Sequence, residues 1–162
     1  MTNMSEKPDF MSEVASDRPE VLAHYPVIHY QPIHWGEMDA FNHSNNVVYY
    51  RYSESARIGY LHALDMFDGS MVTVLAQSSC QYLHPVTYPD TLLLGVRCQR
   101  LGNTSIAMEY SYYSTAQNKI VATADAVVVR LDSDGKGKLP WTAEERARLL
   151  ALEAKFGHTP EY

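Results

Sequence analysis

The segment from Glu37 to Asn46 places carboxylate, imidazole and amide side chains close together inside an otherwise aromatic part of the chain. The residues with chemical potential are Glu37, Asp39, Asn42, His43, Asn45 and Asn46. A carboxylate can attack a carbonyl carbon or activate a water molecule for that attack. The segment is therefore a candidate site for chemistry at a carbonyl group.

A long helix is expected directly after this segment, over Val47–Leu64, and Asn45 or Asn46 suits its N-cap. It is apolar or aromatic around much of its circumference, which is typical of a helix wrapped by other structure. The first N–H groups of a helix lack intrahelical partners, so they can stabilise a developing oxyanion. A second interpretation is that Asp39 and the asparagines only cap this helix and form an Asx turn.

The rest of the chain predicts a sheet and a terminal helix. An edge-type strand is expected over Val27–Trp35, because Pro26 and Pro32 limit ladder hydrogen bonds. Four more strands, bounded by turn residues and expected to form the hairpins of a meander, cover residues 71–84, 91–101, 105–115 and 120–131. The capping box Thr142-Ala-Glu-Glu145 opens an amphipathic helix to about Phe156.

Period-2 alternation assigns faces in two of these strands. One face would carry Leu92, Leu94, Val96 and Cys98, and another would carry Ala122, Ala124, Ala126 and Val128. Small alanine side chains would let a helix approach the sheet closely. The expected fold class is α+β, with one antiparallel sheet of five or six strands wrapped around one long central helix, plus a C-terminal helix.

Length and composition limit the other possibilities. A chain of 162 residues predicts a single domain, which we assign to residues 25–160, after an N-terminal segment over residues 1–24 that is expected to be a tail or a short surface helix. The 13 Lys and Arg against 19 Asp and Glu argue against a nucleic-acid partner. No secretory signal or membrane-spanning run is visible, so a cytoplasmic location is expected.

The cysteines predict no disulfide, and the histidines predict no metal site. Cys80 and Cys98 are expected to stay free thiols, because neither lies in a CxxC pair. The spacing of His34, Asp39 and His43 matches no standard ligand motif, so neither a metal nor another cofactor is predicted.

Three motifs resemble the hotdog-fold thioesterases, specifically the 4-hydroxybenzoyl-CoA thioesterase and acyl-CoA thioesterase group. They are Trp35-Gly-Glu-Met-Asp39, His43-Ser-Asn-Asn-Val-Val-Tyr49 and Tyr52-Ser-Glu-Ser-Ala-Arg57. Downstream, Arg100-Leu-Gly-Asn-Thr-Ser105 resembles the Arg-x-Gly-x-Thr/Ser turn of the same family. The similarity covers roughly residues 28–131 and implies a hotdog fold, in agreement with the strand order.

The resemblance also implies roles for individual residues. Asp39 matches the catalytic aspartate, and Asn46 falls where the family uses a backbone N–H to polarise the thioester carbonyl. His43 is a further catalytic candidate. Substrate-binding candidates are Asn45, Tyr49, Arg100, Thr104, Ser105 and Arg130. Arg100 and Arg130 would meet the phosphates of coenzyme A or, alternatively, be ordinary surface arginines. The pair Glu54 and Arg57 is expected to form an ion pair that orients the helix.

The activity implied is hydrolysis of an acyl-CoA or aroyl-CoA to the free acid and coenzyme A, with Asp39 as general base or nucleophile. The family pattern implies a homodimer, or a dimer of such dimers, with each site at the dimer interface. One alternative is a hotdog protein that binds an acyl thioester without cleaving it or has a structural role. Another is an acyl-carrier-protein thioesterase, because His43-Ser-Asn-Asn46 resembles the His-x-Asn-Asn stretch of the plant enzymes, although Phe41 stands where those carry an asparagine.

Overall fold

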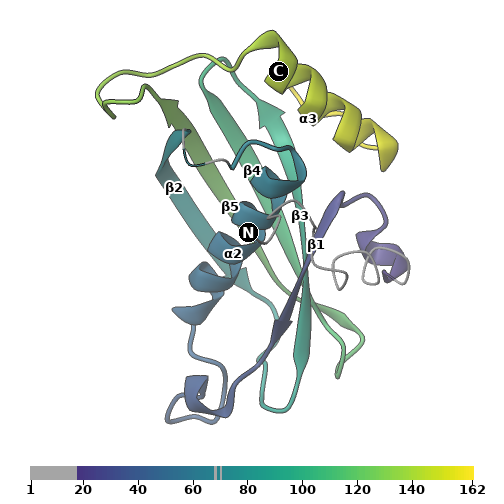
Figure 1. The fold of residues 1–162 in the computed structure, drawn as a ribbon. Coiled ribbons are helices and arrows are strands. Elements are labelled where there is room, and N and C mark those ends of the chain that lie inside the picture. Colours follow the sequence, from purple (N-terminus) through teal and green to yellow (C-terminus); the bar gives the residue numbers. More distant parts are fainter. Residues whose placement is uncertain (1–17, 68, 70) are drawn as a thin grey trace, which may run out of the picture.

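The computed structural model describes residues 18–67, 69 and 71–162. Along the chain the elements are η1 (Glu20–Leu22), β1 (Val27–Pro32), η2 (Trp35–Glu37), α2 (Val48–Ala63), β2 (Val72–Tyr82), β3 (Thr91–Leu101), β4 (Ser105–Ser114), β5 (Lys119–Leu131) and α3 (Ala143–Lys155). One antiparallel sheet carries the long helix α2 on one face, and α3 packs near the end of β3 (Figure 1). The predicted architecture is confirmed, with five strands in the sheet.

The strand order is β1-β3-β4-β5-β2. The meander is confirmed for β3, β4 and β5, but it was a wrong prediction for β2, which pairs with β5. A tight hairpin joins neighbouring strands through a few residues. The connection over residues 83–90 is longer and contains Pro85 and Pro89, and it carries the chain from one edge of the sheet to β3 beside β1.

The core lies between α2 and the sheet. Leu92, Leu94, Val96 and Cys98 are each 0% exposed, as their alternation predicts. The small side chains of β5 are also buried on the inner face, where they leave room for α2. On the helix, Tyr52, Ala56 and Tyr60 face the core, while the opposite side exposes Tyr50 and Arg51.

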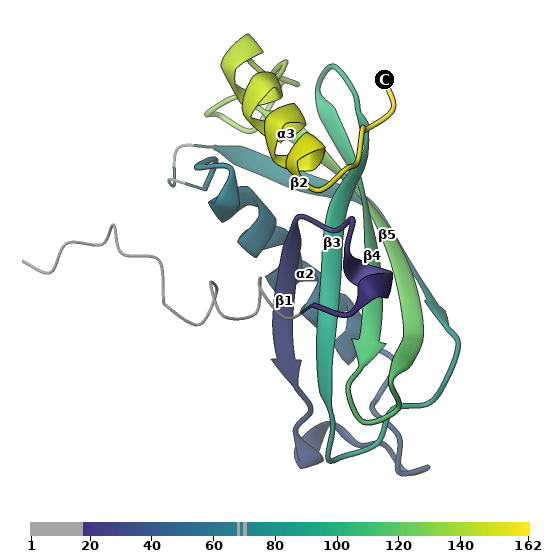
Figure 2. The same cartoon turned by 90° about the vertical axis from the view of Figure 1, so that its right-hand side faces the viewer.

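A second, smaller cluster lies on the outer face of the sheet. Leu22 and Tyr25 pack there with Ile28 and Leu93, and Figure 2 shows η1 on the side of the sheet away from α2. Gly95 permits this packing, because a Cβ at this position would lie 2.7 Å from the ring of Tyr25. Residues 18–24 of the expected tail therefore include a packed turn, and residues 1–17 lie outside the described residues.

Helix α3 begins where the sequence predicts. The side chain of Thr142 accepts a hydrogen bond from the N–H of Glu145, and the Glu145 carboxylate accepts one from the N–H of Thr142. Both cysteines are free thiols, as predicted. None of the helices in the described residues is long and apolar enough to cross a membrane.

Candidate active site

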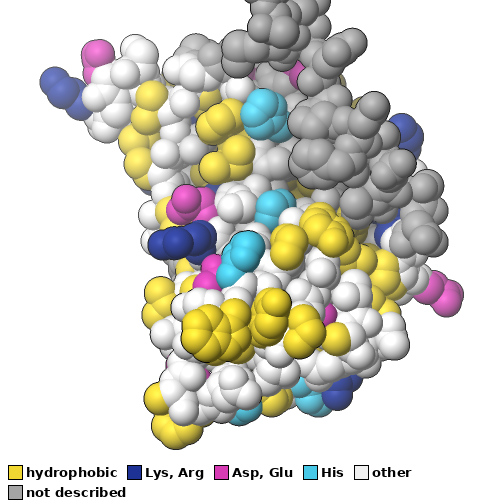
Figure 3. Space-filling model, turned by 60° about the horizontal axis from the view of Figure 1, so that its bottom comes forward, with side chains coloured by type: hydrophobic (Ala, Val, Ile, Leu, Met, Phe, Trp, Pro, Cys, Tyr) yellow, Lys and Arg dark blue, Asp and Glu magenta, His cyan; other side chains and the backbone are white. Residues whose placement is uncertain are grey.

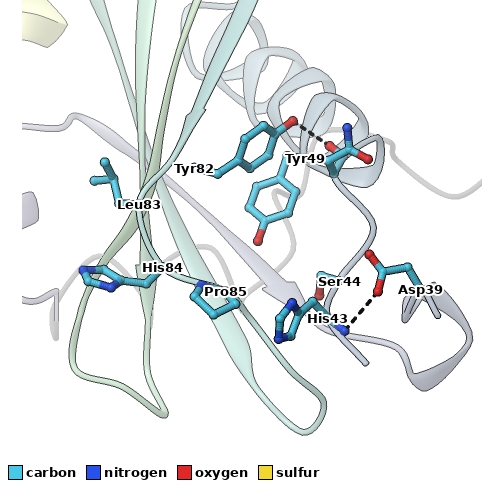
Figure 4. A pocket seen from close by; sticks show the side chains of 9 residues that line it. Asp39, His43, Ser44, Tyr49, Tyr82, Leu83, His84 and Pro85 are labelled. Carbon is cyan, nitrogen blue, oxygen red and sulfur yellow. Dashed lines mark hydrogen bonds between the residues drawn. The ribbon is translucent and has the colours of Figure 1, made fainter. Parts of the chain in front are cut away.

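A cavity of about 360 Å³ lies where the loop after η2, the start of α2 and the end of β2 meet. Its lining residues come from three separate parts of the chain: Asp39, His43, Ser44, Asn46, Tyr49, Tyr82, Leu83, His84 and Pro85. Asp39 contributes the only carboxylate of this lining. Figure 4 shows its carboxyl group turned toward the other lining residues.

Asp39 closes its own loop through one carboxylate oxygen. Its Oδ1 accepts hydrogen bonds from the N–H groups of Phe41 at 2.8 Å and His43 at 3.3 Å. Asn42 adopts a φ of 61° in this turn, a conformation that asparagine tolerates well. The Asx-turn interpretation is therefore correct for Oδ1. Oδ2 accepts no hydrogen bond from the residues that the structure describes, so it is available to a ligand in the cavity.

The entry to α2 leaves two backbone donors unused. The N–H groups of Val47 and Val48 donate to the side-chain and main-chain oxygens of Asn45, at 3.0 and 3.1 Å. The predicted N-cap at Asn45 or Asn46 is wrong: the N-cap position is Val47, and the Asn45 side chain instead forms an Asx turn just before it. The N–H groups of Asn46 and Tyr49 have no hydrogen-bond acceptor within residues 18–67, 69 and 71–162. Both residues line the cavity, so their free N–H groups are candidate donors to an oxyanion.

Tyrosine side chains form the inner wall of the cavity. The rings of Tyr49 and Tyr82 meet edge to face, with 4.9 Å between centroids and an interplanar angle of 88°. Burial raises the pKa of Tyr49 to about 12, and partial burial also raises the pKa of Tyr82. Both phenols are therefore neutral near pH 7 and act as hydrogen-bond donors, not as bases.

Glu37, the first acidic residue of the motif, anchors the loop to the helix. Its Oε2 accepts a hydrogen bond from the hydroxyl of Tyr52, and the same oxygen is near the N–H of His34 at 3.3 Å. The hydrogen bond from Asn45 N–H to the Glu37 carbonyl, at 2.9 Å, ties the two ends of the loop together. Glu37 is thus engaged in holding the loop, and Asp39 is the carboxylate presented to the cavity.

The structure does not bring every predicted site residue to this cavity. Tyr82 pairs with Ala122, whereas Arg130 pairs with Thr73 at the other end of the same two strands. At about 3.3 Å per residue, the stretch between Ala122 and Arg130 spans about 26 Å. Three further candidates also lie around the far end of the sheet: Arg100, Thr104 and Ser105. Within one chain these four residues are remote from Asp39.

Arg130 and Arg57 both bond to groups within the chain. Arg130 pairs with Glu145 of α3 and lies over the ring of Trp141, with 5.5 Å to the centroid. The expected ion pair between Glu54 and Arg57 was wrong: Arg57 donates to the hydroxyl of Tyr110 at 3.3 Å, and Glu54 is exposed. Arg57 turns toward the sheet because Tyr110 offers a buried acceptor there.

Sequence reasoning missed the contributions of Ser44, Tyr82, Leu83, His84 and Pro85 to the lining. Ser44 lies inside the recognised motif, and its buried hydroxyl oxygen has no partner among the described residues. The other four follow one another at the end of β2, where they carry no local sign of a site. Non-local contacts bring them to the loop, such as the hydrogen bond of 2.7 Å that the N–H of Ser44 donates to the carbonyl of Val86.

Three large apolar side chains near the site in sequence are exposed. Trp35, Phe41 and Val47 are 74%, 81% and 66% exposed. Seen from this end of the molecule, hydrophobic and histidine side chains lie side by side on the surface (Figure 3). No group of three or more His, Cys, Asp or Glu that could hold a metal ion occurs in the described part of the chain.

Comparison with known proteins gives consistent matches. Residues 33–149 match the family model of the Thioesterase-like superfamily. YsmA of Bacillus subtilis strain 168, an uncharacterised protein, is 29% identical over 120 residues, which cover 73% of this chain and 81% of that protein.

Solved structures agree with the fold. A thioesterase from Thermus thermophilus, described as complexed with coenzyme A and Zn, is 30% identical with a TM-score of 0.72, covering 81% of this chain and 97% of that one. A thioesterase-superfamily structure from Jannaschia sp. CCS1 is 26% identical with a TM-score of 0.76, covering 91% and 93%. The predicted hotdog fold is thereby confirmed.

Proposed function

The chain belongs to the thioesterase-like superfamily, and we propose that it hydrolyses the thioester bond of an acyl-CoA or aroyl-CoA. The observation that carries the proposal is the cavity shared by Asp39 and the start of α2. It joins a carboxylate with one unused oxygen to two backbone N–H groups without acceptors. Hydrolysis of an acyl group requires this combination of a base or nucleophile and an oxyanion site.

The reaction balances in either of two ways. As general base, Asp39 takes a proton from water, the water oxygen bonds to the carbonyl carbon, and the C–S bond breaks to release the thiolate of coenzyme A. As nucleophile, Asp39 bonds to the carbonyl carbon through Oδ2 and expels the thiolate, and water then hydrolyses the mixed anhydride. The thiolate receives a proton in both routes, and both routes develop negative charge on the carbonyl oxygen.

The neighbouring residues have distinct roles in this proposal. The N–H groups of Asn46 and Tyr49 stabilise the charge on the carbonyl oxygen. Asn45 holds the turn that presents them, and the ring of His43 contacts the substrate from the side of the loop. The Tyr49 ring, together with Tyr82, provides an apolar wall for the acyl group.

A homodimer would complete the site, and pairs of dimers would form a tetramer. Strand β2 is an edge strand, and Leu75 on it is 50% exposed. Such an edge is open to pairing with another chain. Antiparallel pairing of two copies of β2 would place the Thr73 end of one beside the Tyr82 end of the other. The arginines at the far end of the second chain, Arg100 and Arg130, would then approach the cavity together with Thr104 and Ser105.

This arrangement supports a coenzyme A substrate. The phosphates of coenzyme A need cationic partners, and the lining of the cavity in one chain contains no lysine or arginine. The similar protein from Thermus thermophilus is described as a complex with coenzyme A. Arg100 is exposed and would be available to a phosphate across the interface.

The proposal is tested by incubating the purified protein with a panel of aliphatic and aromatic CoA thioesters and acyl-carrier-protein thioesters, and measuring release of free thiol. We expect thiol release from at least one CoA thioester and weaker release from the carrier-protein forms. Thermal stabilisation by the thioesters without thiol release would contradict the proposal and indicate a non-catalytic binding protein.

A further inference from the structure

The carbonyl of Asn46 is bonded across the cavity and not along the helix. The hydroxyl of Tyr82 donates to this oxygen at 2.9 Å, and Figure 4 shows the Tyr82 ring reaching from β2 toward the start of α2. In a regular helix the N–H of Tyr50 would donate to it. Here the N–H of Tyr50 donates instead to the carbonyl of Val47, at 3.3 Å.

This bonding pattern is connected with the free N–H groups of the turn. The first turn of α2 is tightened, because Val48 and Tyr50 each bond to the carbonyl three residues earlier. The carbonyl of Asn46 accepts from the Tyr82 hydroxyl and does not accept from the N–H of Tyr49, three residues further along. This first turn of α2 lacks the regular hydrogen bonds of an α-helix, and it therefore presents unpaired N–H groups to the cavity.

A second tyrosine holds the other end of this turn. The hydroxyl of Tyr112 on β4 donates to the carbonyl of Tyr49 at 2.7 Å. Tyr112 is 0% exposed and lies in the core, whereas Tyr82 is 43% exposed and lines the cavity. The turn is thus fixed from two strands, and Tyr82 is the member of the pair that can be altered without opening the core.

We propose that Tyr82 is a positioning residue for the reaction: its hydrogen bond to the Asn46 carbonyl fixes the first turn of α2 so that the N–H groups of Asn46 and Tyr49 point at the thioester oxygen. This inference rests on the proposed function. Preorganised donors stabilise developing charge because they need no reorganisation during the reaction. A turn free to relax into a regular helix would pair one of these donors with a backbone carbonyl and lose it for catalysis.

The edge-to-face contact makes the test specific. Tyr82→Phe removes the hydroxyl and retains the ring that packs against Tyr49. Tyr30→Phe is the matched control, because Tyr30 is 47% exposed on β1, outside the cavity, and its hydroxyl has no hydrogen bond among the described residues. Each variant is measured as the full chain, for kcat and KM on the best CoA thioester and for binding of a non-hydrolysable thioether analogue of it.

We expect Tyr82→Phe to lower kcat about tenfold while KM and the Kd of the thioether stay within about twofold, because the lost interaction acts only in the transition state. Tyr30→Phe should leave all three unchanged. An unchanged kcat for Tyr82→Phe would overturn the proposal. A rise in KM and thioether Kd would also overturn it, because the hydroxyl would then be a direct substrate contact.

Amide hydrogen exchange reports on the first turn of α2 and does not require that the protein be catalytically active. Tyr82→Phe should alter exchange at residues 46–50, because it loosens the turn in which the N–H groups of Val47, Val48 and Tyr50 are bonded, and leave the rest of α2 unchanged. If the wild-type protein cleaves no thioester, the proposed function fails, and the exchange result still decides whether Tyr82 fixes the turn. Unchanged exchange at residues 46–50 would contradict the positioning role even in an active enzyme.

Discussion

Asp39 and His43 are joined by two hydrogen bonds that run in opposite directions. The N–H of Asp39 donates to the carbonyl of His43 at 2.8 Å, and the N–H of His43 donates to Oδ1 of Asp39 at 3.3 Å. The loop is closed by these groups and not by the imidazole, whose ring makes no hydrogen bond to the described residues. The ring of His43 lines the cavity and is available to a substrate.

His43→Ala should therefore leave the fold intact and weaken substrate binding. We expect a free energy of unfolding within about 0.5 kcal/mol of wild type, because the residue is exposed and only its backbone bonds the loop. We expect kcat/KM to fall about tenfold, mainly through KM. Urea denaturation and steady-state kinetics measure the two quantities. A lower stability with unchanged kinetics would assign His43 a structural role instead.

The buried carboxyl group of Glu153 gives a prediction about pH. It is 0% exposed, and its Oε1 accepts hydrogen bonds of 2.6 Å from the Tyr60 hydroxyl and from the Cys98 N–H. Burial raises its pKa above the ordinary value of 4.5, against the opposing effect of these hydrogen bonds. Between pH 4.5 and the raised pKa of the folded state, the unfolded chain loses this proton while the folded chain retains it. The contribution of Glu153 to the free energy of unfolding therefore falls as the pH rises above 4.5.

Glu153→Gln should remove this dependence, because the amide does not titrate and its oxygen still accepts from Tyr60. Thermal midpoints from pH 5 to pH 9 are compared with those of wild type and of Glu144→Gln, an exposed change on the same helix. We expect the advantage of Glu153→Gln over wild type to grow as the pH rises toward the raised pKa of the folded state and to level off above it, and Glu144→Gln to follow wild type. An advantage that is constant or shrinks as the pH rises would show that the Glu153 carboxyl is not held in its protonated form.

Gly95→Ala should destabilise the outer face of the sheet. The added Cβ would lie 2.7 and 2.9 Å from ring atoms of Tyr25, close to where the ring joins its own Cβ and cannot swing away. We expect a loss of about 2 kcal/mol in the free energy of unfolding, as for other overpacked sites. Gly36→Ala is the control, because no atom lies within 4 Å of its Cβ position. Equal effects of the two substitutions in urea denaturation would contradict this packing.

Leu75→Lys should dissociate the proposed dimer. Leu75 is 50% exposed on the edge strand β2, so a charge there costs a single chain little but would be buried between two copies. Sedimentation velocity at micromolar concentration should show a dimer for wild type and a monomer for the variant. Val21→Lys, a change at a 54% exposed valine on η1, should remain a dimer. A monomeric wild type, or a dimeric Leu75→Lys protein, would count against pairing through β2.

Local sequence pattern predicted the elements well, because their signals are local. Strand β3 has the predicted bounds of Thr91–Leu101, and α2 differs from its prediction by one residue at each end. The Thr142 capping box marked the start of α3 correctly. The edge strand β1 ended early, at Pro32, because the chain turns into η2 and Glu37 engages the N–H of His34.

The cavity residues that the sequence predicted all lie close together along the chain, between Asp39 and Tyr49. The motif located Asp39 and the start of α2, and the structure places both at one cavity. Tyr82 comes from a strand whose partner is 40 residues further along the chain, at Ala122, and no local pattern specifies such a pairing. The same non-local arrangement separates Arg130 from the cavity, which one sequence read alone could not indicate.

In the proposed reaction, the free oxygen of Asp39 drives thioester cleavage beside the start of α2. Asp39→Asn tests it most directly, because the amide oxygen can still accept from the N–H groups of Phe41 and His43 and so preserves the loop. Thiol release from the best CoA thioester is measured for the folded variant and for wild type. We expect kcat to fall at least about 100-fold with an unchanged thermal midpoint. A folded Asp39→Asn protein that releases thiol at the wild-type rate would contradict it.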